Sequence, residues 1–256
     1  MPAQKTNAAP RPKKTTGKAG KMAPKSKNSP DKNAPELSCS ECAVRNCYRR
    51  DKKFPAFCLT TANPDAVRAT RELYRGDHLD ARLARVAATI EGEYYGRLTR
   101  VEETIIFAQK LGVKKLGIAS CIGLLDEATQ FAAIVRAAGI APRTVICKIG
   151  GIDKTEIGLA EELKVCPQCH ESCCNPVLQA RELSRWGAEL NVLIGLCVGH
   201  DALFYRHTTA PTTTLIVKDR VLAHNPAAAL YTAKFYYKRL QDPKNFPAPR
   251  GGKNRV

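Results

Sequence analysis

Short apolar segments alternate with amphipathic helical segments through the second half of the chain, and this alternation constrains the fold more than any other feature. The apolar segments are KKLGIAS (114–120), RTVICKIGG (143–151), LNVLIGLC (190–197) and TTTLIVKD (212–219). The helical segments are LLDEATQFAAIVRAAG (124–139), NPVLQARELSRWG (175–187) and NPAAALYTAKFYYKRL (225–240). Such alternation is typical of parallel sheets covered by helices. We predict an α/β fold with a doubly wound, mainly parallel sheet of about four or more strands.

A helical lead-in precedes the first predicted strand. Apolar residues recur at three- and four-residue spacing, and Gly112 stands where a helix would end. The predicted helices are PDAVRATRELY (64–74), HLDARLARVAATIEGEYY (78–95) and RVEETIIFAQKLG (100–112). We therefore divide the chain into a tail (1–36), a cysteine module (37–62), an α/β domain (63–240, with the lead-in at 63–112 and the strand–helix repeats at 113–240) and a flexible C-terminal tail (241–256).

The tail, residues 1–36, is strongly basic. It holds nine Lys/Arg against two Asp/Glu, a net of +7 out of a formal +17 for the chain, and it has no aromatic residue. A segment of this composition buries too little apolar surface to order itself. We expect a disordered tail that either binds nucleic acid weakly by neutralising phosphates or simply solvates the protein.

Cysteine usage restricts the chemistry. No run of eighteen apolar residues and no signal-peptide pattern is present, so we expect a cytoplasmic protein. Eleven cysteines in a reducing compartment are unusual for a disulfide framework, and several stand at spacings of two to four residues. The pattern favours metal binding or thiol chemistry.

Four cysteines open the ordered part of the chain at the spacing C-x2-C-x4-C-x10-C: Cys39, Cys42, Cys47 and Cys58. Two sulfurs two residues apart can ligate one ion, and a second pair completes a tetrahedral shell. A segment this short and polar would take its folding free energy from the metal. We predict a four-cysteine metal module that holds Zn²⁺ or an Fe–S cluster.

A second group of cysteines follows the predicted strands or precedes a predicted helix: Cys121, Cys147, Cys174 and Cys197. Parallel strands finish at one edge of the sheet, so these thiols should converge there, with Lys148 and His200 as candidate cofactor-binding residues. A helix N-terminus after Cys174 should lower the pKa of its thiol. Four thiolates, or three with His200 or His224, would suit Zn²⁺ or an Fe–S cluster. The plain alternative is that some of these thiols only pack behind the sheet.

A rival interpretation makes Cys197 a nucleophile. Gly195-Leu196-Cys197-Val198-Gly199 between a strand and a helix has the pattern of a nucleophile elbow. GLCVGHDAL (195–203) resembles the nucleophile segment of class I glutamine amidotransferases, although the His-Pro-Glu signature of that family is absent. In a hydrolase or amidotransferase of this kind, His224 would be the base, and Asp219 or Asp201 would orient it.

Two further motifs are less decisive. CPQCH (166–170) matches a c-type haem attachment pattern, but that attachment normally requires export, so no haem is expected. Cys166, Cys169, His170 and Cys173 could instead form a second zinc knot, donate one ligand to the sheet edge, or lie in a plain loop. EGEYYGRLTRVEET (91–104) is typical of surface ion pairs on adjacent helical turns, although its two tyrosines and a glycine also suit a face docked over a crevice.

Several of these stretches together resemble a family of uncharacterised cysteine-rich bacterial and archaeal proteins. That family is filed under a domain of unknown function and is commonly labelled metal-binding protein. The similarity is carried by EGEYYGRLTRVEETIIFA, KLGIASCIGLLDEA, CKIGGIDK, CNPVLQA, NVLIGLCVGHDALF and TTTLIVKDRVLAHNPAAALY. The resemblance implies metal binding through the N-terminal cysteines and the strand-end thiols. It implies no reaction and no substrate. It does not extend to the basic tail or to Cys166, Cys169 and Cys173.

Overall fold

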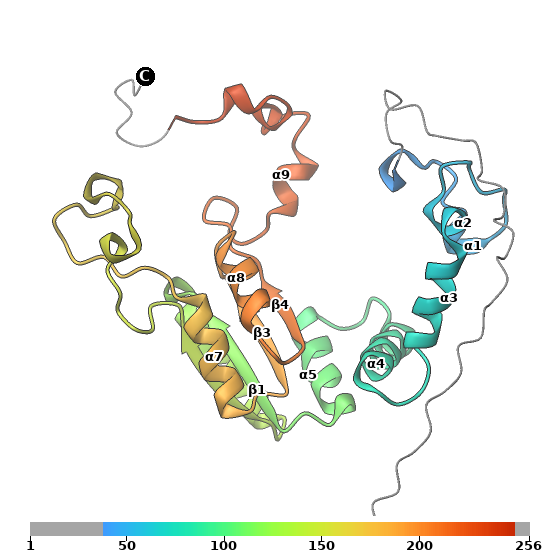
Figure 1. Ribbon diagram of the computed structural model, residues 1–256, viewed down its shortest axis with the longest axis horizontal. Helices are drawn as coiled ribbons and strands as arrows, with labels where there is room; N and C mark the ends of the chain where they lie inside the picture. Colours follow the sequence, from blue (N-terminus) through green and yellow to red (C-terminus); the bar gives the residue numbers. More distant parts are fainter. Residues whose placement is uncertain (1–37, 249–256) are drawn as a thin grey trace, which may run out of the picture. The chain divides into compact units, whose positions relative to one another are not determined.

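The computed structural model of the chain describes residues 38–248, which fall into two compact units (Figure 1). The first unit ends at Val67 and the second begins at Arg68. The predicted basic tail, with its proposed contact to nucleic acid, lies outside the described residues. None of the described helices is both long and apolar enough to cross a membrane.

The first unit has almost no interior. It contains α1 (Asn46–Arg49), α2 (Leu59–Ala62) and the start of α3 (Pro64–Leu73). Asn46 is the only buried residue among residues 38–67, and its side chain exchanges two hydrogen bonds with the backbone of Lys52. No apolar side chain of this stretch is buried. Hydrophobic burial therefore contributes little to its stability.

The second unit is built on a four-stranded sheet in which every pair of neighbours is parallel, with the order β2-β1-β3-β4. The strands are β1 (Lys115–Ser120), β2 (Ala141–Ile146), β3 (Leu190–Ile194) and β4 (Thr212–Ile216). This confirms the predicted α/β fold with a parallel sheet. The chain steps to one side of β1 for β2 and to the other side for β3, which creates a topological switch point between β1 and β3.

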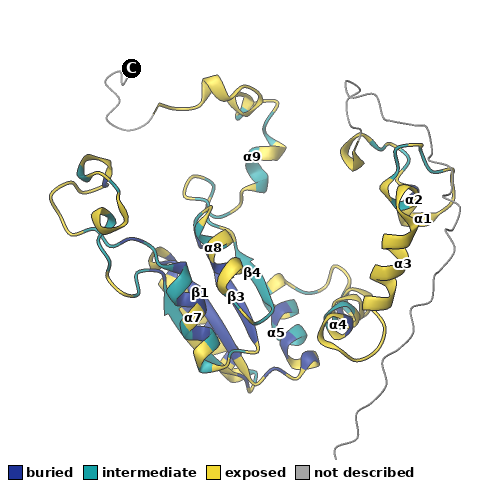
Figure 2. Cartoon of the chain, viewed as in Figure 1, coloured by how far each residue is buried: buried dark blue, intermediate teal, exposed yellow. Residues whose placement is uncertain are grey.

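Burial follows the strand order (Figure 2). All of β3 and all but the first residue of β1 are buried, whereas the edge strand β4 is half-buried throughout. Near-continuous apolar runs are the expected pattern for central strands covered on both faces. The core therefore centres on β1 and β3, and the residues after these strands are held at fixed positions.

Helices complete this core. They are α4 (Leu79–Tyr94), α5 (Arg100–Leu111), α6 (Leu125–Ala137), α7 (Pro176–Trp186) and α8 (His200–His207). Helix α6 packs on β1 and β2, while α7 packs on the same strands and against α8. Gln179 of α7 is fully buried and donates to the carbonyl oxygens of Ser120 (3.1 Å) and Val145 (2.7 Å). This side chain pins α7 to the carboxyl ends of β1 and β2.

Several predicted boundaries are wrong. The second, third and fourth strands end at Ile146, Ile194 and Ile216, three to five residues earlier than predicted. β3 stops because Gly195 adopts a left-handed φ of 66°. The Gly195 N–H donates to the carbonyl oxygen of Ile216, the last residue of β4. Cys197 therefore lies in a turn beyond the strand.

The predicted C-terminal helix is also shorter. Helix α9 covers only Ala227–Tyr231 and gives way to turns. Tyr231, Phe235 and Tyr236 are exposed, so the apolar residues of this segment have no packing surface within the described chain. Short helices depend on such packing, which explains why the sequence periodicity is not realised.

Replacing Gly195 with alanine should destabilise the protein through both conformation and crowding. An added Cβ would lie 2.5 Å from Cδ1 of Leu124, which is itself buried. We expect Gly195→Ala to lower the free energy of unfolding by about 3 kcal/mol. Gly139→Ala is the matched control: Gly139 has a φ of 79° but no atom within 4 Å of an added Cβ. Gly139→Ala should lower the free energy of unfolding by about 1 kcal/mol. Urea titration measures this quantity for both variants, and equal losses would contradict the predicted clash with Leu124.

Candidate metal centre at the sheet edge

The carboxyl edge of the sheet carries cysteines from separate parts of the chain. Cys121 and Cys147 directly follow β1 and β2, and their N–H groups extend the ladder by donating to Ile194 O (3.0 Å) and Ser120 O (2.8 Å). Cys174 precedes Asn175, the N-cap of α7, and the Asn175 N–H donates to Cys147 O at 2.7 Å. Backbone hydrogen bonds thus fix three of the four cysteines beside the strand ends.

Cys147 and Cys174 form a thiol pair whose Sγ atoms lie 3.6 Å apart. The Sγ–Sγ hydrogen bond with Cys147, together with the positive charges of Lys148 and His200, lowers the pKa of Cys174 to about 5 even though burial opposes the shift. The same hydrogen bond and burial raise the pKa of Cys147 far above its usual range. The pair therefore holds one proton at neutral pH, with Cys174 as the thiolate. The predicted fall in the pKa of Cys174 is present, but it arises chiefly from Cys147 rather than from the helix.

Cys197 joins this group through Arg220. The Arg220 Nη2 atom lies 3.1 Å from Cys197 Sγ. That hydrogen bond and the charge of Cys197, followed by those of Cys121 and Cys174, raise the pKa of Arg220. The charges of Cys121 and Cys174 thus act on Arg220 together with that of Cys197, and Cys121 and Cys174 also act on Cys147. Convergence of all four thiols on one ligand site stays a prediction.

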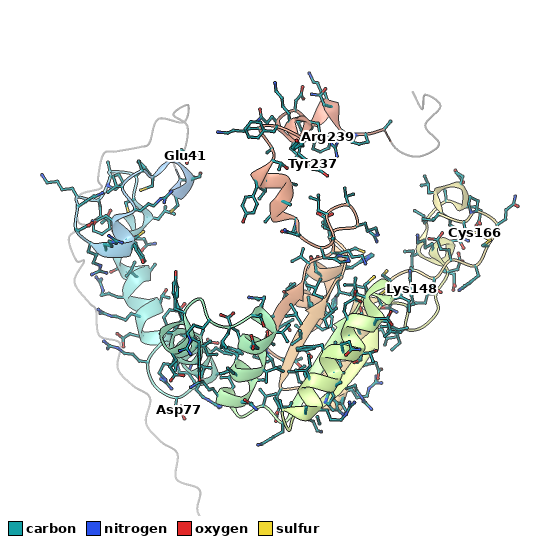
Figure 3. The ribbon with its side chains drawn as sticks, turned by 180° about the vertical axis from the view of Figure 1, so that it is seen from behind. Glu41, Asp77, Lys148, Cys166, Tyr237 and Arg239 are labelled. Atoms are coloured by element: carbon teal, nitrogen blue, oxygen red, sulfur yellow. A yellow bond between two sulfur atoms is a disulfide. The ribbon has the colours of Figure 1, made fainter. Side chains whose placement is uncertain are left out.

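Basic groups surround the thiols. Lys148 donates from Nζ to Ser172 O at 2.6 Å, and its charge acts on Cys174. A Cβ built on Gly123 would lie 3.5 Å from Lys218 Nζ and 4.0 Å from Cys121 Sγ, so this lysine also borders the group. With Arg220, these side chains supply fixed positive charge that favours thiolates over thiols. Figure 3 shows Lys148 at the root of the loop that carries Cys166 at its outer end.

His200 brings a nitrogen atom to the same edge. Its backbone N–H donates to Cys197 O at 2.9 Å, and its charge acts on Cys174. The ring Nδ1 atom is buried and has no hydrogen-bond partner among the described residues. An unpaired buried imidazole nitrogen is available to a metal ion or to a bound polar group.

The geometry around Cys197 differs from a nucleophile elbow. The left-handed residues are Gly195 and Gly199, at φ 66° and 86°, and Cys197 is not among the positive-φ residues. Its hydrogen-bond partner is Arg220 rather than the predicted base. His224 Nδ1 instead accepts a hydrogen bond from the Asp219 N–H at 3.1 Å, which leaves the proton of a neutral ring on Nε2. Asp201 accepts from the Gly199 and Ala202 N–H groups at the start of α8.

The N-terminal cysteines lie in the first unit. Cys39 and Cys47 are exposed, and Cys42 and Cys58 are half-buried. Burial would raise the pKa of Cys58, but hydrogen bonds from Thr60 and Thr61 outweigh it and lower that pKa below its ordinary value. A lower pKa favours the thiolate, which is the form of cysteine that ligates metals.

In the CPQCH loop, Cys166 and Cys169 are joined in a disulfide, and His170 contacts Asp153 and Ser172. The predicted zinc roles of this loop stay predictions. The loop folds around Lys164, which is 8% exposed and lies 2.9 Å from Asp153 Oδ1 and 3.0 Å from Glu161 Oε2. Cys173 is buried next to Cys174, and its backbone N–H donates to Ile152 O.

Within residues 38–248, no three His, Cys, Asp or Glu side chains converge closely enough to hold a metal ion without moving. The thiol pair is the part that is already assembled, and further ligands would need side-chain rearrangement. Sequence reasoning missed Arg220, Lys218 and Gln179. The first two follow β4 at the same sheet edge, and this position was the available signal for them.

Comparisons with known proteins agree with the sequence resemblance. The model of a family described as "Protein of unknown function (DUF1847)" matches residues 58–215. The chain is also similar to "Uncharacterized protein MJ0455" from Methanocaldococcus jannaschii. The two are 41% identical over 209 residues, which covers 81% of this chain and 100% of that protein.

The family match places the two cysteine groups differently. All four edge cysteines fall inside residues 58–215. Of the N-terminal cluster, only Cys58 does, whereas we expected the family pattern to include the whole cluster. The family model therefore covers the whole sheet-edge group but only Cys58 of the N-terminal cluster.

The thiolate at Cys174 should be visible in the pH dependence of its alkylation. In metal-free protein, labelling by iodoacetamide should be half-maximal near pH 5 and level above about pH 6. An ordinary thiol instead gains about tenfold per pH unit until its pKa near 8.5. Peptide mass spectrometry across the pH range measures this rate at Cys174 alone.

Cys147→Ala removes the hydrogen-bond partner of Cys174, so it should raise the pKa of Cys174 and move the half-maximum to higher pH. Cys173→Ser, at the adjacent position, should leave the midpoint unchanged. A wild-type labelling rate that still climbs between about pH 7 and pH 8.5 would show that Cys174 is an ordinary thiol.

Proposed function

This chain belongs to the DUF1847 family, and we propose that it binds a thiophilic metal centre, Zn²⁺ or an Fe–S cluster, through the thiols at the carboxyl edge of its sheet. The observation that carries the proposal is the 3.6 Å separation of the Cys147 and Cys174 sulfurs. In a tetrahedral site with metal–sulfur bonds of about 2.3 Å, neighbouring sulfurs are about 3.8 Å apart. The pair therefore has the spacing of two ligands of one ion.

Further donors at the sheet edge would have to move to complete the site. Cys121 and Cys197 are the other candidate thiolate ligands, and the unpaired Nδ1 atom of His200 is a candidate nitrogen ligand. The pKa of the Cys147 thiol is raised by its neighbour Cys174. The positive charge of a bound metal would therefore be needed to deprotonate Cys147. The edge residues thus provide a donor set that suits Zn²⁺ or iron.

The charges around the thiols support a thiolate-rich centre. Four thiolates around Zn²⁺ leave a net charge of about −2. Lys148, Lys218 and Arg220 would offset that charge, whereas they would repel a bare cation held by neutral ligands. The Ile122 N–H and Arg220 also donate to Cys147 and Cys197 sulfurs, the kind of contact that tunes thiolate-bound metals.

We propose a redox or sensor role for this centre. Cys174 and Cys197 are half-buried rather than sealed, so oxidants and electrophiles can reach them. The N-terminal cysteines would hold a second centre, and the lack of a buried apolar core in that unit supports metal-dependent folding there. The alternative of a Cys197–His224 hydrolase has less support, because Arg220 contacts the thiol and His224 is held by Asp219.

Removing one sulfur of the pair should weaken metal binding at the edge without affecting the N-terminal module. Titration of metal-free, full-length protein with Co²⁺ reports thiolate ligation through its charge-transfer absorption. We expect Cys174→Ser to reduce affinity for the edge site by at least about tenfold and to lose the corresponding absorption. Cys39→Ser/Cys42→Ser should abolish the other signal.

Cys173→Ser is the control, because Cys173 is buried beside Cys174 and its thiol makes no contact with another thiol among the described residues. It should bind Co²⁺ as the unchanged protein does. If Cys174→Ser and the wild type give the same titration, the sheet edge is not a metal site.

A further inference from the structure

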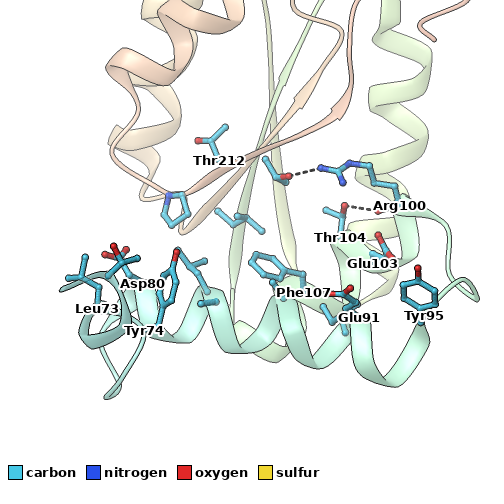
Figure 4. Close-up of a pocket in the computed structure, with 18 of the residues that line it drawn as sticks. Leu73, Tyr74, Asp80, Glu91, Tyr95, Arg100, Glu103, Thr104, Phe107 and Thr212 are labelled. Carbon is cyan, nitrogen blue, oxygen red and sulfur yellow. Dashed lines mark hydrogen bonds between the residues drawn. The ribbon is translucent and has the colours of Figure 1, made fainter. Parts of the chain in front are cut away.

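A large cavity lies at the opposite end of the sheet from the thiols (Figure 4). It encloses about 940 Å³ between α4, α5 and the starts of β3 and β4, with Leu190, Pro211 and Thr212 among its walls. Leu190 begins β3, whereas Cys197 follows the end of that strand. The length of β3 separates the two places by about 15 Å. The cavity is therefore distinct from the thiol edge.

The cavity is held open by anchored helices. Arg82 of α4 donates to Leu111 O at the end of α5, and Lys110 of α5 pairs with Glu93 of α4 at 2.9 Å. Arg100 ties the start of α5 to β4, since its Nε donates to Thr214 O at 2.9 Å and its Nη2 to Thr213 Oγ1 at 3.1 Å. The space lies between elements that are joined at several points.

Most of the lining is apolar. Leu83, Ala84, Ala87, Ile90 and Phe107 face it from α4 and α5, together with Leu190 from the sheet. A cavity of this size and composition is in the range that holds small organic molecules. An apolar body of the ligand would replace water against these walls.

The charged groups that line the cavity favour a positively charged ligand. Three carboxylates line the cavity, from Asp80, Glu91 and Glu103, against one guanidinium, from Arg100. The carboxylates of Glu91 and Glu103 form no ion pair or hydrogen bond with any described residue, so the ion pairs predicted within residues 91–104 do not involve them. Figure 4 shows both toward the same end of the cavity as Tyr95. This is an anionic cavity in a chain of formal net charge +17.

We propose that this cavity binds a small organic cation, an amine with an apolar or aromatic body. The amine lies against Glu91 and Glu103, and the apolar body lies along Ile90 and Phe107. Tyr95, which also lines the cavity, adds an aromatic ring beside the cation. The carboxylates of Glu91 and Glu103 would repel a ligand that is itself a carboxylate. A polyamine has no apolar body, so the apolar walls would stay in contact with water.

A matched set of probes tests the proposal on the full-length protein. The compounds 4-phenylbutylamine, 4-phenylbutanol and 4-phenylbutyrate share one apolar body and differ in charge. Calorimetric titration should give the order amine, alcohol, carboxylate, with the amine at least about fivefold tighter than the alcohol. Spermidine, which lacks the apolar body, should bind more weakly than the amine.

Glu91→Gln/Glu103→Gln should reduce amine affinity to that of the alcohol and leave alcohol binding unchanged. Glu127→Gln is the control, because Glu127 is an exposed carboxylate of α6 that does not line the cavity. Ala87→Trp should fill the space and abolish binding of both the amine and the alcohol. Thermal melting checks that each variant is folded. The proposal is overturned if no probe binds, if the three phenylbutyl compounds bind alike, or if the double variant retains the preference for the amine.

Discussion

Parallel pairing of β1 with both β2 and β3 is the constraint on which the rest of the second unit depends. Because these strands run in one direction, the residues that follow them must leave the sheet at one edge. Burial on both faces holds β1 and β3 in the core of the unit. Cys121, Cys147 and Cys197 are brought together by this geometry, although they are far apart in sequence.

The edge thiols behave as a coupled group rather than as separate cysteines. One proton shared between Cys147 and Cys174 lowers one pKa and raises the other, so their protonation states cannot be described independently. The surrounding basic side chains lower the free-energy cost of burying a thiolate. A half-exposed thiolate held in this way is reactive, which links the electrostatics to the proposed redox or sensor role.

Sequence patterns were sufficient for the sheet and its cysteines, because apolar runs and strand–helix alternation are local signals of a parallel sheet. They also placed α3, α4 and α5 to within a residue or two. The contact of Arg220 with Cys197 depends on the turn after β4, which no local pattern encodes. The cavity depends on how α4 stands against β3 and β4, so the carboxylates of residues 91–104 looked like ordinary surface charges. The C-terminal segment has a helical pattern but no surface to pack on, and α9 is accordingly short.

The measurement that tests the central claim most directly is X-ray absorption spectroscopy of the bound metal. It uses protein in which Cys39, Cys42, Cys47 and Cys58 are replaced by serine. With the N-terminal ligands removed, the sheet edge is the predicted source of a sulfur shell. Our account predicts bound zinc or iron with at least two sulfur neighbours at about 2.3 Å. Metal bound only through oxygen and nitrogen, or no metal at all, would contradict it.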